Sequence, residues 1–253
     1  MDPQIIDSTT VTPILTVLGY AAIAAGFASF GVIPLVWRQP VSTRLLGLAN
    51  SMAAGLMLGA AYALMVIDPD GFSPVSAFAA LLGIAYVLFT HWVIGTTDLD
   101  LNRLDEEDPT YGYKVLLVNT LHGAAEGVAI GVAMAVSIPF GTFVALAIGV
   151  HNVPEGTVLA AVLSSRGARI RDAAALTIAA NIGQVLLAVA TFAIVTEVPV
   201  MLPWAAGFAI GALIYLVLAE LLPESYREVG PTSVALTAIV AMGMLVVLTE
   251  MNL

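Results

Sequence analysis

Long apolar stretches separated by short polar or Pro- and Gly-containing breaks make up most of this chain. Each stretch has about the 20 residues that a helix needs to cross a bilayer, and none shows the short alternating pattern of barrel strands. We predict eight spans with boundaries at residues 12–37, 45–67, 74–96, 115–138, 141–165, 173–195, 203–223 and 232–250. We therefore expect residues 1–253 to form a single all-α transmembrane domain with no separate soluble domain.

Composition supports this interpretation and excludes several other classes of protein. Apolar residues are 60% of the chain and charged residues 10%, whereas a soluble domain is about half apolar and about a quarter charged. The lack of cysteine excludes disulfides, thiolate metal sites and a cysteine nucleophile. A net charge of −10 argues against a nucleic-acid partner, and the N-terminus lacks the basic start of a secretory signal.

The basic residues predict the orientation in the membrane. Every lysine and arginine falls in a break that follows an odd-numbered span: Arg38, Arg44, Arg103, Lys114, Arg166, Arg169, Arg171 and Arg227. The breaks on the other side carry Asp68, Asp70 and Glu197 and no basic residue. Because basic loops stay inside, we predict a multi-pass protein of the cell (inner or plasma) membrane with both termini outside, extracellular or periplasmic.

The longest predicted loop, residues 97–113, lies on the cytoplasmic side and is rich in acids. It is either a solvated, flexible linker or a weak collector of cations that leave a pathway through the membrane.

A repeated polar motif occurs inside the fourth and fifth spans, where ionisable residues are costly and usually functional. His122 and Glu126 lie four residues apart and are followed by glycine; His151 and Glu155 repeat the same H-x-x-x-E-G pattern. Residues four apart share one helix face, so each helix presents an imidazole and a carboxylate in one direction. Both motifs lie near mid-membrane, on antiparallel helices joined by a tight turn that we predict at residues 139–141.

Two imidazoles and two carboxylates suit a divalent metal such as Zn²⁺, and two buried anions offset one dication. Without metal we expect at least one carboxylate to hold a proton, so that metal binding displaces protons. Pro154 frees a backbone carbonyl inside the fifth span, which is tolerated where a helix lines a cavity. The competing interpretation is that these side chains only hydrogen-bond helices together. His91, a lone histidine, is expected to be a packing or outer-shell residue.

These residues resemble the ZIP (Zrt- and Irt-like) metal transporters, whose hallmark is paired H-N-x-P-E-G-type motifs on helices 4 and 5. The seventh span also resembles the family, in particular its bacterial GufA-like branch, in the segments G-A-L-I-Y (211–215) and E-L-L-P-E (220–224). The segment A-G-L-M-L (54–58) resembles the same branch. The resemblance covers nearly the whole chain and implies eight spans with both termini outside.

Carried over to this chain, the resemblance implies a metal site that is formed by His122, Glu126, His151 and Glu155, with Met57 beside it. The family's second metal position would use residues 123 and 152 and a carboxylate of the sixth span. In this chain residue 123 is a glycine, residue 152 is an asparagine, and the sixth span contains no acidic residue. We therefore expect one strong site, with Asn152 or Gln184 as weak ligands. The resemblance also implies that family members move metal into the cytoplasm by an elevator-like movement of one helix group against another. Glu220 and Glu224, at the cytoplasmic end of the seventh span, either help to receive the departing ion or form a solvated helix end.

We therefore predict a transporter, not an enzyme, that takes up a divalent transition metal by alternating access. Zinc is the preferred cargo, with Cd²⁺, Fe²⁺, Mn²⁺ and Co²⁺ as further candidates, and no prosthetic group is expected. The expected partners are the metal ion and the lipid bilayer, and a homodimer is left open. The alternatives are an intramembrane metal-dependent hydrolase, which would need a further acid or base, and a metal-selective cation channel.

Overall fold

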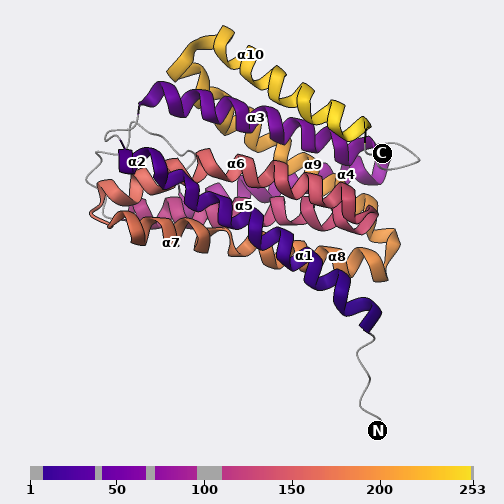
Figure 1. Ribbon diagram of the computed structural model, residues 1–253. Helices are drawn as coiled ribbons and strands as arrows, with labels where there is room; N and C mark the ends of the chain where they lie inside the picture. The colour runs from indigo at the N-terminus through magenta and orange to yellow at the C-terminus, as the bar shows by residue number, and fades with distance from the viewer. Residues whose placement is uncertain (1–7, 38–41, 67–71, 96–109, 252–253) are drawn as a thin grey trace.

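A computed structural model describes residues 8–37, 42–66, 72–95 and 110–251, which are almost entirely helical and contain no strand. The helices lie side by side in one bundle (Figure 1). In chain order they are α1 (Ser8–Phe27), the 3₁₀ turn η1 (Ala28–Val32), α2 (Ile33–Trp37), α3 (Thr43–Val66), α4 (Pro74–Ile94), α5 (Tyr111–Val136), α6 (Ile138–Ser165), α7 (Ile170–Ala180), α8 (Ile182–Glu197), η3 (Pro199–Met201), α9 (Leu202–Leu216), the π-helical turn η4 (Val217–Leu221) and α10 (Leu222–Glu250).

Local signals explain where several helices begin and end. Ser73 caps α4 by accepting a hydrogen bond from the backbone of Ser76, and Gly95 ends the helix with a left-handed φ of 71°. Ser137 is the single residue between α5 and α6, and its hydroxyl accepts a hydrogen bond from the Phe140 backbone N–H at 3.2 Å. The turn that we predicted at residues 139–141 therefore occurs at Ser137, because a proline at 139 fits the first turn of a helix.

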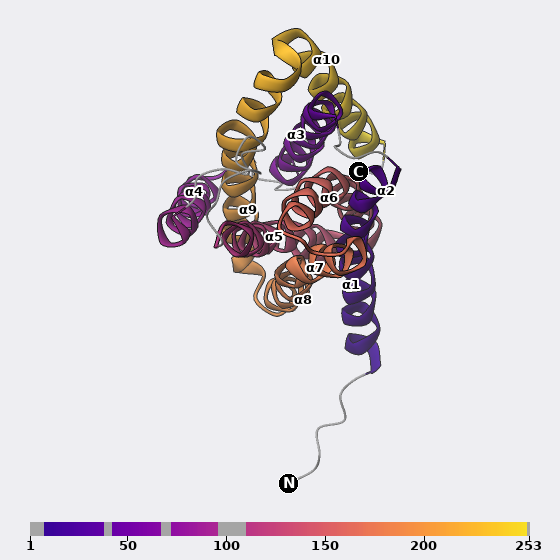
Figure 2. The same ribbon diagram turned by 90° about the vertical axis from the view of Figure 1, so that its left-hand side faces the viewer.

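Seven helical runs in the described part of the chain are long and apolar enough to cross a membrane. The seventh, Pro199–Glu250, has 52 residues and is bent at Gly230, whose φ of 77° is not helical. The arm after the bend is about 20 residues long, enough for a further span, and it packs along α3 (Figure 2). The polytopic all-α prediction is confirmed, whereas the count of eight stays a prediction, because the break expected at 224–231 is a bend within one helical run.

Glycine contacts among the described helices occur within two groups of helices and not between them. Many glycines pack so tightly that an added Cβ would overlap a neighbouring helix, as Gly127 of α5 does against Gln184 of α8. Such contacts join α1, η1, α5, α6 and α8 to one another, α3 to α10, and α4 to α9. The first set, with α7 packed on α6 and η1, is called the first group; α3, α4, α9 and α10 are called the second group, in which α9 continues through η4 into α10 and packs against α3. Every described glycine that packs within 4 Å of another element does so inside its own group. Close backbone contact of this kind locks helices together in membranes.

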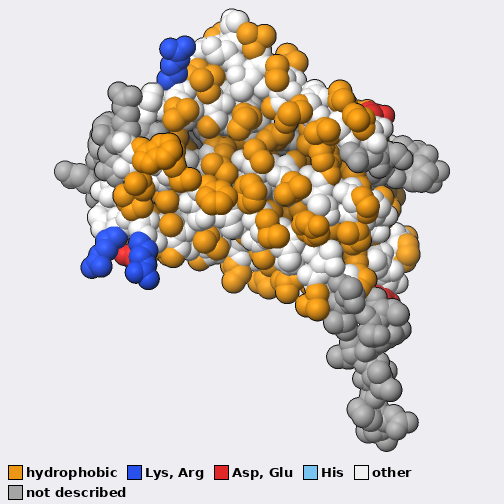
Figure 3. Space-filling view, viewed as in Figure 1, with side chains coloured by type: hydrophobic (Ala, Val, Ile, Leu, Met, Phe, Trp, Pro, Cys, Tyr) orange, Lys and Arg blue, Asp and Glu red, His pale blue; other side chains and the backbone are white. Residues whose placement is uncertain are grey.

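The charged residues lie at the two ends of the bundle, and its sides are apolar. In Figure 3 the blue lysine and arginine side chains are all at the end where α6 finishes and α7 begins, with one red acidic side chain among them, and the other red side chains are at the opposite end. The first residues of α1 and the last of α10 are both at that opposite end (Figure 1). Large apolar side chains such as Leu81 and Leu236 cover the outer surface, as lipid contact requires.

Candidate metal centre

A cavity of about 50 Å³ lies inside the bundle, large enough for a few water molecules or one ion. It lies between the two groups of helices. The first group provides His122, Glu126, His151, Glu155 and Val158, and the second provides Asn50, Ala53, Met57, Leu216, Glu220, Leu221, Glu224 and Arg227. The four motif residues predicted from the sequence thus line one cavity, and Met57 lines it too.

The first cluster of metal-ligand side chains in this cavity consists of Glu126, His151 and Glu155. Nε2 of His151 lies 3.3 Å from Oε1 of Glu126 and 3.8 Å from Oε2 of Glu155. One ligand atom from each residue lies within 4.8 Å of the others, and all three side chains are nearly buried. Two carboxylates and one imidazole in this arrangement suit Zn²⁺ or a similar divalent ion.

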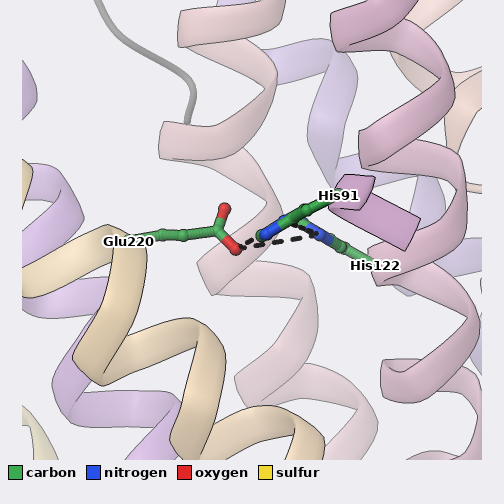
Figure 4. Close-up of side chains that lie close together, drawn as sticks. All are labelled: His91, His122 and Glu220. Atoms are coloured by element: carbon green, nitrogen blue, oxygen red, sulfur yellow. Dashed lines mark hydrogen bonds and ion pairs between the residues drawn. The ribbon is translucent and has the colours of Figure 1, made fainter. Parts of the chain in front are cut away.

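The second cluster consists of His91, His122 and Glu220, which come from α4, α5 and η4 (Figure 4). Nε2 of His91 lies 3.0 Å from Nε2 of His122 and 3.0 Å from Oε1 of Glu220, and Nε2 of His122 lies 3.8 Å from the same carboxylate oxygen. These atoms also lie within 4.8 Å of one another. The pair of i, i+4 motifs therefore divides between two clusters, with His122 in one and Glu126, His151 and Glu155 in the other.

His91 and Glu220 were not assigned to the primary site from the sequence, since they lie on helices far from the two motifs along the chain. The scarcity of histidine could have indicated the role of His91. The whole sequence has three histidines, His91, His122 and His151, and all three lie in the two clusters. Glu220 enters the cavity from a π-helical turn, where the Leu222 N–H bonds back to the Val217 carbonyl. Such turns are frequent at functional sites.

The amide side chains that we predicted as weak ligands lie in another environment. Asn152 is buried, and its amide group donates hydrogen bonds to the Ala24 carbonyl at 2.9 Å and to Oε1 of Gln184 at 3.0 Å. Neither Asn152 nor Gln184 lines the cavity. The pair instead links α1, α6 and α8 within the first group. The acidic segment predicted at 97–113 lies largely outside the described residues.

The charges in the cavity explain why a cation would be stable there. Glu126, Glu155, Glu220 and Glu224 all line it, and Arg227 is the one lysine or arginine among the lining residues. Buried carboxylates are costly unless protons, hydrogen bonds or cations compensate them. A divalent ion would supply this compensation.

The profile of the ZIP zinc-transporter family matches residues 103–249, which include both motifs and η4. The chain belongs to this family. The match confirms the resemblance inferred from the motifs, and it favours a transporter over the alternative of an intramembrane hydrolase.

Two curated relatives of this ZIP chain are also named as zinc transporters. A protein of Arabidopsis thaliana named "Putative zinc transporter" is 32% identical over 230 residues, which cover 89% of the chain and 37% of that protein. The zinc transporter GufA of Myxococcus xanthus is 35% identical over 113 residues, 44% of each chain. The matched regions thus cover less than half of the length of either relative.

Proposed function

We propose that this ZIP protein carries divalent transition-metal ions, zinc foremost, into the cytoplasm through the cavity between α5, α6 and the second group of helices. One observation carries the proposal: all three histidines and three buried glutamates of the chain meet in two adjacent clusters within the membrane-spanning helices. Ionisable residues at this depth mark an ion pathway.

The first cluster is suited to carry the ion. Glu126, His151 and Glu155 all belong to α5 and α6, within the first group of helices. These two helices are joined through Ser137 alone, so the three ligands would keep their geometry if the group moved as a unit. The metal could then cross while it remains bound to the same side chains.

The second cluster is suited to receive or release the ion. His122 belongs to the first group, whereas His91 and Glu220 belong to the second. A displacement of one group along the other would separate these three ligands. The cluster would therefore form in one conformation and be lost in the other, which is what a release step in alternating access requires.

The packing around the cavity supports release toward the basic, cytoplasmic end. Arg227 lines the cavity, and the bend at Gly230 lies close to it in the chain. Toward the opposite end, the helices pack through nearly fully buried side chains of Leu64, Ile130, Met134, Phe140 and Val144. We assign the present arrangement to the inward-facing state. The glycine contacts support movement of whole groups, because they lie within each group and none joins one group to the other.

Uptake of Zn²⁺ into proteoliposomes tests the proposal. We expect saturable uptake by the wild type and its loss in Glu126→Ala, His151→Ala and Glu155→Ala. Glu197→Ala is the matched control, because Glu197 is exposed at the acidic end of the bundle. Normal uptake by all three site variants would reject the site. Currents far above the turnover of a carrier would instead favour a channel.

A further inference from the structure

An arginine lines the same cavity as the metal-ligand clusters. Nη1 of Arg227 lies 3.0 Å from Oε2 of Glu224, one helical turn away. The Glu224 side chain is 7% exposed and the Arg227 side chain is 49% exposed. A nearly buried carboxylate in the cavity is therefore paired with a cation whose side chain reaches solvent.

These residues continue the path that begins at the second cluster. Glu220 of that cluster, Glu224 and Arg227 follow one another at spacings of four and three residues, and all three line the cavity. Residues with this spacing lie along one helix face. An ion that leaves Glu220 toward the basic end would meet Glu224 next, and there it would meet the guanidinium group.

A metal ion bound to Glu224 would lie a few ångströms from the Arg227 guanidinium, and two cations this close repel each other, so the ion and the guanidinium would compete for the carboxylate. The guanidinium is always charged and sits on a long, half-exposed side chain, so it can move into solvent and return. The ordinary alternative is an exposed i, i+3 ion pair, which contributes little to any property.

We propose that Arg227 is a tethered counter-ion that competes with the transported metal for Glu224. The guanidinium pairs with Glu224 when the ion is absent and moves away when the ion arrives. By returning to Glu224 it displaces the ion, which then leaves toward the cytoplasm. It also lowers the affinity of the exit for ions that would bind from the cytoplasm. Arg227 is thus a positioning residue, and this inference rests on the proposed transport function.

The test compares Arg227→Gln, Arg227→Lys, Glu224→Gln and the double variant in proteoliposomes. The measurements are the KM and Vmax for Zn²⁺ uptake, and the inhibition of uptake by Zn²⁺ trapped inside. For Arg227→Gln we expect Vmax to fall severalfold and internal Zn²⁺ to inhibit at about tenfold lower concentration, because the ion remains on Glu224. Arg227→Lys should stay close to wild type, and the double variant should lose the heightened inhibition. Arg171→Gln, which removes an exposed arginine at the same end, should behave as wild type.

Unchanged inhibition by internal Zn²⁺ in Arg227→Gln would overturn the inference, as would equal heightened inhibition in the double variant. If Arg227→Gln does not yield folded protein, Arg227→Lys and Glu224→Gln test the inference in its place. Glu224→Gln should then show weaker inhibition by internal Zn²⁺ than wild type, and inhibition equal to wild type would refute the role of Glu224. A wild type without Zn²⁺ uptake would reject the transport function itself, whereas Zn²⁺ titration of the purified variants would still report the competition at Glu224.

Discussion

The Nε2 atoms of His91 and His122 lie 3.0 Å apart and join helices that belong to different groups. The hydroxyl of Tyr86 donates a hydrogen bond of 2.8 Å to the Leu121 carbonyl, immediately beside this contact. Glu220 lies 3.8 Å from His122 on another helix of the second group. Polar contacts from α4 and η4 thus converge on one turn of α5, whereas His151 contacts Glu126 and Glu155 within its own group.

This difference predicts distinct effects for the histidines. His91→Ala should slow Zn²⁺ uptake at saturating metal while the purified protein still binds Zn²⁺, because Glu126, His151 and Glu155 remain. His151→Ala should weaken binding itself. Isothermal titration together with initial uptake rates separates the two effects. Equal loss of Zn²⁺ affinity in both variants would contradict the assignment of His91 to the release step.

Metal binding should release protons and weaken as the pH falls. Zinc requires neutral imidazoles and ionised carboxylates, so protons held by these side chains without the ion must leave when the ion binds. We therefore expect lower Zn²⁺ affinity at about pH 6 than at about pH 8. Titrations in two buffers of different ionisation enthalpy measure the protons released. Identical apparent enthalpies in both buffers would mean that no proton is displaced.

The buried amide pair should be structural. Asn152→Ala removes two hydrogen bonds that link α6 to α1 and α8, and the buried partners are left behind. We expect a loss of about 1–3 kcal/mol in the free energy of unfolding and little change in Zn²⁺ affinity. Thermal unfolding in detergent and isothermal titration test both parts. A large loss of affinity at unchanged stability would instead support the prediction from sequence that Asn152 is a weak ligand.

The glycine contacts predict a large difference between two similar substitutions. A Cβ at Gly127 would overlap the backbone of Gln184, whereas a Cβ at Gly243 meets nothing within 4 Å. Gly127→Ala should therefore destabilise the protein by about 1–3 kcal/mol, and Gly243→Ala should be neutral or slightly stabilising. Melting temperatures in one detergent compare them directly. Equal melting temperatures would argue against tight packing of α5 on α8.

The predicted orientation can be tested because the chain has no natural cysteine. Arg171→Cys places a thiol at the basic end and Glu197→Cys places one at the acidic end, both at exposed positions. In intact cells, a membrane-impermeant maleimide should label only the thiol at position 197. Labelling at 171 alone would reverse the orientation and the proposed direction of transport.

The sequence predicted the parts of this fold that depend on local patterns. Apolar stretches predicted a polytopic all-α protein, and the i, i+4 spacing placed His122 and Glu126, and His151 and Glu155, on shared helix faces that line the cavity. It could not assign His91, because only the packing of α4 and η4 against α5 brings this residue to His122. The sequence also could not show that residues 224–231 are a bent part of α10 and not a loop. The polar residues, Gly230 and the proline after it are equally typical of both structures.

The three histidines of the chain all lie in the two clusters, which has a practical consequence. A sample labelled with nitrogen-15 in histidine alone would give imidazole signals from these two clusters and from nowhere else in the chain. Those signals would report ring tautomers, ion occupancy and the exchange between transport states in the unmodified protein, with no need for an attached probe.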